Sequence, residues 1–182
     1  MDTSKVILDE ARPKLTRHLS ERAQQKVGQN VNLLGEVVLG NGEADHRYHH
    51  YLEALEAPDI NYISVKISGI YAQTHALNYE ESFPELVKRM SALYQKAMDF
   101  PHTDENGVKR AKFVNLDMEE YKDSHFTLRL FKTVLSKPEF KDYSAGIVVQ
   151  AYLPMLMISR RNCWNLQRHA WQREAHHSKC AL

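Results

Sequence analysis

Four short apolar runs, each carrying a polar residue, constrain the fold of this chain more than any other feature. They occupy residues 31–39, 62–68, 112–116 and 146–152. A short apolar run bounded by turn signals is typical of a strand that is buried on both faces. Helical patterns separate the runs, and this alternation predicts an α/β protein with parallel strands and right-handed crossovers.

Amphipathic segments between the runs predict the helices. Residues 4–28 carry one apolar stripe and are expected to close at Gly28. Residues 43–57 form a second predicted helix, which stops before a proline. A capping box with Ser82 as its cap predicts the start of a third helix.

A polar segment and a fourth helix complete the predicted elements. Residues 99–110 are polar and contain Asn106-Gly107, so we expect a loop there. The fourth helix is expected to be capped by Asp123 or Ser124 and to end before Pro138.

The polar residues of the four runs are the candidate site residues. They are Glu36, Lys66, Asp117 and Gln150. Ligands of parallel α/β folds bind at the carboxyl ends of the strands. The segment after the first run is a poor phosphate-binding glycine loop, which disfavours an open doubly wound sheet. We therefore expect the first four β/α units of a truncated, TIM-like (β/α)8 barrel, with these four residues on its rim.

The residues alone leave two of these side chains with alternative roles. Glu36 either lies on a solvated loop after a strand that ends at Gly35, or is buried and holds a cationic partner. Lys66 either extends outward to water or points inward and binds a carboxylate or a phosphate. Asp117 is the acid most expected to face inward, because acids that follow it suit a helix start.

Composition narrows the class of protein. No apolar run approaches the roughly 18 residues of a membrane span, and the N-terminus lacks the apolar core of a signal peptide, so we expect a cytoplasmic protein. His46 and His50 have a spacing that can suit a metal, but no third ligand stands near them. We therefore expect a solvated helix face and no metal.

The last 28 residues differ from the rest of the chain. Residues 155–182 contain five basic residues and one acid, whereas residues 1–154 contain 19 basic and 22 acidic residues. Both cysteines and both tryptophans lie in this tail, without the spacing of a disulfide framework. The tail has no nucleic-acid-binding motif, so we expect no nucleic-acid partner.

Four segments of the sequence together resemble one known family. NLLGEVVL, YISVKISGIYAQ, VNLDMEE with TLRLF, and GIVVQAYLP are similar to successive blocks of bacterial proline dehydrogenase, including the dehydrogenase domain of the proline utilisation A flavoproteins. The resemblance covers residues 30–154 in matching order. It gives three expected regions: an N-terminal helical segment at 1–29, a partial dehydrogenase barrel at 30–154, and a non-homologous tail at 155–182.

The resemblance implies a distorted barrel that holds FAD and oxidises L-proline to 1-pyrroline-5-carboxylate. Lys66 matches the lysine that pairs with the proline carboxylate, and Asp117 matches an aspartate near the flavin and the substrate. Gln150 matches a glutamine that hydrogen-bonds the flavin, and Glu36 matches a glutamate that holds substrate-binding arginines. The resemblance leaves open a quinone or another electron acceptor and peripheral association with a membrane, whereas no transmembrane segment is expected.

The sequence also departs from the family. It lacks the Arg-Leu-Val-Lys-Gly-like flavin motif and the late arginine pair that clamps the carboxylate, since Arg160-Arg161 comes too early. A one-base frameshift before the Met155 codon would explain the tail. We expect an inactive chain, or alternatively a non-catalytic fragment that acts only as an assembly or binding protein. Such a fragment would use its basic tail or its open strand edges, through which it could self-associate. Another (β/α)8 enzyme with a phosphate substrate is a third interpretation.

Overall fold

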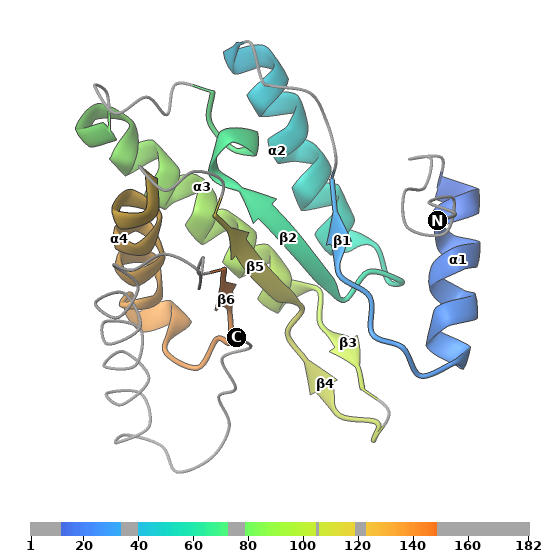
Figure 1. Ribbon diagram of the computed structural model, residues 1–182. Helices are drawn as coiled ribbons and strands as arrows, with labels where there is room; N and C mark the ends of the chain where they lie inside the picture. Colours follow the sequence, from blue (N-terminus) through green and yellow to red (C-terminus); the bar gives the residue numbers. More distant parts are fainter. Residues whose placement is uncertain (1–11, 34–39, 73–78, 105, 119–122, 149–182) are drawn as a thin grey trace, which may run out of the picture.

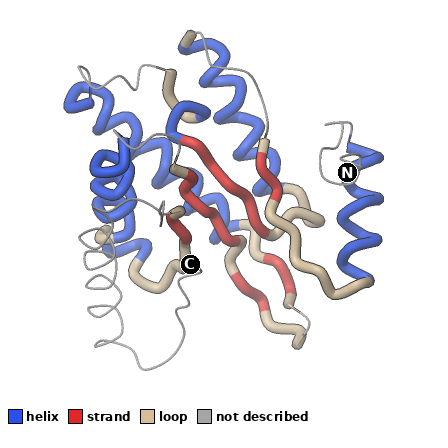
Figure 2. The backbone as a smooth tube through the Cα atoms, in the orientation of Figure 1, coloured by secondary structure: helices blue, strands red, loops and turns tan. Residues whose placement is uncertain are grey.

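A computed structural model describes residues 12–33, 40–72, 79–104, 106–118 and 123–148 of the chain. Figures 1 and 2 show a parallel sheet with helices packed against it. The elements follow one another as α1 (Arg12–Gln24), β1 (Val31–Asn32), α2 (Asn41–Glu56), β2 (Tyr62–Lys66), the 3-10 helix Ile67–Gly69, α3 (Tyr79–Asp99), β3 (His102–Thr103), β4 (Lys109–Arg110), β5 (Phe113–Asp117), α4 (Ser124–Leu135), the 3-10 helix Pro138–Phe140 and β6 (Gly146–Ile147).

The main sheet has four parallel strands in the order β1-β2-β5-β6. This order follows the chain, so each described strand pairs with the next of the predicted runs. The prediction of consecutive parallel β/α units is confirmed for these strands. The helix α2 packs against β2 and α3, and α3 packs in turn against β5 and α4 (Figure 1).

Side-chain alternation along β2 and β5 separates the two faces of the sheet. Ile63 and Val65 on β2, and Val114 and Leu116 on β5, are at most 1% exposed and belong to the hydrophobic core. Their helical partners share deep burial and an apolar side chain; they include Leu55, Leu86, Met90, Leu93, Leu130 and Val134. The remaining residues of these two strands therefore face away from the helices.

Two predicted helix ends are wrong. The helix α3 begins at Tyr79 and not after a cap at Ser82, because Ser82 is only 2% exposed and lies within the buried side of the helix. The helix α1 ends at Gln24 and not at Gly28. Lys26 adopts a left-handed φ of 56°, and the N–H of Val27 donates to Arg22 O at 3.1 Å, which closes the helix earlier.

The predicted loop at residues 99–110 contains a small antiparallel hairpin made by β3 and β4. Its turn depends on Asp104, whose Oδ1 accepts hydrogen bonds from the N–H groups of Asn106 and Val108, both at 2.9 Å. Gly107 has a φ of 77°, which suits glycine, so the Asn106-Gly107 turn signal is confirmed.

The end of β2 also differs from the prediction. β2 ends at Lys66, where the chain enters a 3-10 helix, although the apolar run continues to Ser68.

The start of α4 agrees with the prediction. Asp123, one of the two predicted cap residues, is its N-cap, although its side chain makes no capping hydrogen bond.

A buried lysine joins β5 to the segment that precedes β2. Lys112 is 2% exposed, and its ammonium donates a hydrogen bond to Ala57 O just after α2. Burial lowers the pKa of Lys112, and the nearby Asp59 carboxylate opposes this shift. The hydroxyl of Tyr143 donates to Lys112 O at 3.0 Å, so the same residue also holds the segment before β6.

Replacing this lysine tests the contact. Lys112→Met keeps most of the aliphatic stem but removes the charged donor of Ala57 O, which then keeps only the N–H of Ile60 at 3.3 Å. We expect the free energy of unfolding to fall by about 1–3 kcal/mol, the usual range for a hydrogen bond from a charged group. Urea unfolding measures this change. Lys88→Met, at a lysine whose side chain is 78% exposed, is the control; equal stability changes in both variants would contradict the assignment.

Candidate active site

Lys66 and Asp117 meet at the carboxyl edge of the sheet. Lys66 is the last residue of β2 and Asp117 the last of β5, and the two are register partners. Neighbouring parallel strands lie roughly 5 Å apart, so the two side chains start from adjacent backbone positions. Both residues are half-buried. The structure therefore brings together two of the four predicted site residues.

The other two predicted site residues, Glu36 and Gln150, lie outside the described residues. Their runs nevertheless begin on the strands that flank the central pair: β1 pairs with β2, and β6 pairs with β5. All four predicted positions thus belong to chain segments that begin in adjacent strands.

The face of the sheet that carries Lys66 and Asp117 is built in three layers of cross-strand pairs. The rings of Tyr62 and Phe113 meet edge to face, with centroids 4.9 Å apart. In the next layer the Asn115 amide donates from Nδ2 to Ser64 Oγ at 3.3 Å. Lys66 and Asp117 form the third layer, at the carboxyl ends of the strands.

Tyr62 lies on the same face as Asp117, as the strand register and the alternation of side chains require. Burial raises the pKa of the Tyr62 phenol, and the negative charge of the Asp117 carboxylate raises it further.

Sequence reasoning missed the middle layer. Ser64 and Asn115 are only 3% and 8% exposed, although both are polar. Ser64 Oγ also accepts a hydrogen bond from Asn30 Nδ2 at 2.8 Å. The signal was available, because each is a polar residue two positions before a predicted site residue and so shares its face.

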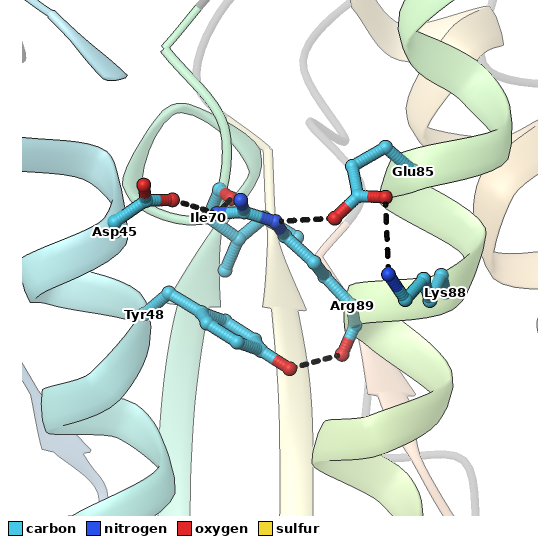
Figure 3. A network of polar contacts seen from close by, with 6 residues as sticks. All are labelled: Asp45, Tyr48, Ile70, Glu85, Lys88 and Arg89. Atoms are coloured by element: carbon cyan, nitrogen blue, oxygen red, sulfur yellow. Dashed lines mark hydrogen bonds and ion pairs between the residues drawn. The ribbon is translucent and has the colours of Figure 1, made fainter. Parts of the chain in front are cut away.

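An arginine network fixes the chain that leaves β2 (Figure 3). Arg89 on α3 lies 2.6 Å from Asp45 on α2 through Nη1, and 3.0 Å from Glu85 through Nε. Its Nη1 also donates to Ile70 O at 2.9 Å. Ile70 comes four residues after Lys66, so the network holds the segment directly behind the site.

The acidic partners in the network stabilise the charged form of the guanidinium. Burial alone would lower the pKa of Arg89, but its hydrogen bonds to Glu85 and Asp45 raise the pKa above its ordinary value. The guanidinium also lies 5.1 Å from the centre of the Tyr48 ring, and the Tyr48 hydroxyl contacts Arg89 O at 3.5 Å. The position of the strand end thus depends on α2 and α3 together.

The next two findings concern metal binding and membrane spans. The rings of His46 and His50 lie 4.2 Å apart, but no group of three His, Cys, Asp or Glu residues in the described part of the chain could hold a metal ion. No helix within the described ranges has the length and apolar character needed to cross a membrane.

Comparison with known proteins gives a consistent family. The family model described as proline dehydrogenase matches residues 15–168, a range that includes part of the predicted tail. Proline utilization A (PutA) from Corynebacterium freiburgense is 35% identical with a TM-score of 0.82, covering 94% of this chain and 17% of that one. None of the curated proteins matches this sequence.

Two further solved structures show the same fold. PutA from Bdellovibrio bacteriovorus, inactivated by N-propargylglycine, is 29% identical with a TM-score of 0.69, covering 84% of this chain and 17% of that one. A D778Y mutant of Bradyrhizobium japonicum PutA is 22% identical with a TM-score of 0.65, covering 78% of this chain and 15% of its own; it supports the fold alone. The chain thus spans about a sixth of the length of the structures it matches.

The arginine network can be tested by mutation. Arg89→Leu removes the donor to Ile70 O and the ion pair with Asp45, and leaves Glu85 with Lys88 at 3.6 Å. We expect the free energy of unfolding to fall by roughly 2–3 kcal/mol, as for charge-assisted hydrogen bonds that are partly buried. Thermal or urea unfolding measures the loss. Lys88→Leu, one residue earlier and largely exposed, should change it by less than about 0.5 kcal/mol; similar losses would contradict the proposed anchor.

Proposed function

Because this chain belongs to the proline dehydrogenase family, we propose that it carries part of an FAD-dependent site that oxidises L-proline to 1-pyrroline-5-carboxylate. The observation that supports this function is the register pairing of Lys66 with Asp117 at the carboxyl ends of two adjacent parallel strands. The family resemblance assigns the carboxylate of the substrate to Lys66 and the neighbourhood of flavin and substrate to Asp117.

We further propose that the sheet is the first half of a (β/α)8 barrel. Its four parallel strands follow chain order, and helices pack against the apolar face. In such barrels the active site lies at the carboxyl ends of the strands, which is where Lys66 and Asp117 end β2 and β5. The similarity to PutA structures supports this architecture.

The residues present suit a flavin and an amino acid. The reaction removes a hydride from a ring carbon of proline and a proton from its nitrogen, and FAD supplies the hydride acceptor. Lys66, half-buried at the sheet edge, would pair with the proline carboxylate, because its ammonium is a compact charge with three donors. Asp117, its register partner, would balance the lysine and accept hydrogen bonds from the ligand.

Two assignments concern residues outside the described part of the chain. In this proposal the Gln150 amide hydrogen-bonds the flavin, and Glu36 holds cationic side chains that bind substrate. The chain lacks the family's flavin motif and its late arginine pair. We therefore propose that residues 1–182 alone do not turn over.

A second candidate function is assembly without catalysis. Among the described strands, β1 and β6 are the outermost of the main sheet. Outer strands present backbone groups that can pair with another chain. Light scattering distinguishes this candidate, since a self-associated species without L-proline binding would favour assembly over the dehydrogenase site.

Substrate binding tests the role of Lys66. Lys66→Met removes the cationic partner of the carboxylate but keeps the stem. We expect the affinity for L-proline, measured by titration calorimetry, to fall at least about tenfold, since losing one member of a desolvated charge pair costs on the order of 2–5 kcal/mol. Lys88→Met is the matched control. Pyrrolidine, which lacks the carboxylate, should not distinguish the variants; unchanged L-proline affinity in Lys66→Met would rule out the assignment.

The proposal that the chain alone is inactive is tested by adding FAD. We expect the purified chain to gain no stoichiometric flavin absorbance and to give no L-proline-dependent reduction of a dye. The absent arginine clamp and flavin motif are the physical reason. Corynebacterium freiburgense PutA, assayed in parallel, is the positive control. A yellow protein that L-proline bleaches would show instead that this chain is a competent enzyme.

A further inference from the structure

The side chain of Asn115 reaches the strands on both sides of β5. It lies two residues before Asp117 on the same face and is 8% exposed. On one side its Nδ2 donates to Ser64 Oγ of β2 at 3.3 Å. On the other side its register partner is Gly146, the first residue of β6.

The lack of a side chain at Gly146 leaves the space that the Asn115 amide occupies. A Cβ atom at this glycine would lie 2.6 Å from Asn115 Oδ1 and 2.9 Å from Cε1 of the Phe113 ring. Both distances are too short for carbon in van der Waals contact. The amide thus lies across the sheet, with its donor toward β2 and its oxygen against β6.

The hydroxyl of Ser64 links Asn115 to Asn30 within this layer. Its Oγ accepts hydrogen bonds from Asn115 and, at 2.8 Å, from Asn30, which precedes β1. Two accepted bonds use both lone pairs of a hydroxyl. Ser64 is only 3% exposed, so water does not readily replace a lost donor. Removing Asn115 or Asn30 therefore leaves the buried Ser64 hydroxyl with one hydrogen bond fewer.

This layer lies directly beneath the candidate site. Ser64 and Asn115 are each two residues before Lys66 and Asp117, and Gly146 is four residues before Gln150. The described ladder between β5 and β6 has two register pairs, and the N–H of Val148 donates to Leu116 O at 2.9 Å. The close packing of Asn115 on the bare backbone of Gly146 lies at the start of this short pairing.

We propose that Asn115 is a positioning residue, which holds β2 and β6 against β5 so that Lys66 and Asp117 present one binding edge to the carboxylate of an amino acid substrate. The inference rests on the proposed function for the identity of that substrate. It assigns Asn115 no contact with the ligand.

The test observes Lys66 directly in the full 182-residue chain. Reductive methylation with ¹³C-formaldehyde labels the lysines, and Lys66→Arg identifies the Lys66 signal. Asn115→Leu keeps the branching and the number of side-chain heavy atoms but removes the amide. We expect this variant to shift the Lys66 signal without ligand and to weaken L-proline binding about tenfold, the effect of one hydrogen bond of ordinary strength.

Val114→Ala is the matched control, because Val114 is the adjacent residue of β5 and faces the helices. It should lower thermal stability at least as much as Asn115→Leu but leave the Lys66 signal in place. If Asn115→Leu does not fold, Gly146→Ala provides the second variant, since its new methyl group displaces Asn115. Adding Asn115→Ala to Gly146→Ala should shift the signal little further, because the methyl group has already displaced the amide.

The outcomes separate the two proposals. A Lys66 signal that is unchanged in both Asn115→Leu and Gly146→Ala would overturn the positioning role. The same holds if Val114→Ala shifts the signal as far as Asn115→Leu does. A wild-type chain that gives no response to L-proline would count against the proposed function, while the ligand-free shift would still decide the role of Asn115.

Discussion

The in-register pairing of β2 with β5 is the constraint on which the rest of the structure depends. Five consecutive residue pairs join the two strands, from Tyr62 with Phe113 to Lys66 with Asp117. Since side chains alternate between the faces, this one register determines both the core and the candidate site. A slip by one residue would turn Lys66 toward the helices and expose the apolar row.

The strand β2 is held at both ends by cationic side chains that donate to backbone carbonyls. Lys112 binds Ala57 O before the strand, and Arg89 binds Ile70 O after it. Lys112 directly precedes β5, which pairs with β2, and Arg89 lies on α3, which packs against β5 and α2. Such bonds satisfy carbonyls at positions where the strand ladder no longer does. The central strand is thereby fixed in the direction along its axis as well as across the sheet.

The sequence predicted the parallel strands and the place of Lys66 and Asp117 at their carboxyl edge, because an apolar run marks a buried strand and the charged residue marks its end; their register pairing comes from the structure. It failed where tertiary contacts override local signals. Ser82 has the pattern of a cap but is buried within α3. The short strands β3 and β4 are polar and, apart from the half-buried His102, exposed, so no apolar alternation marks them. The middle layer was missed because a polar residue inside an apolar run looks like an interruption, whereas Ser64 and Asn115 satisfy each other across the sheet.

The order of the three layers explains why a charge can function at the top of this face. Aromatic rings of Tyr62 and Phe113 form the lowest layer, the neutral hydrogen-bonded pair forms the next, and the charged pair stands last. Buried neutral groups beneath an ion exclude water from one side of it, so its attraction to an anion is stronger than in bulk solvent. The charged residues themselves stay half-buried and avoid the full cost of desolvation. A lysine in this position can bind a carboxylate more strongly than an exposed lysine, while the amide layer below keeps it aligned with Asp117.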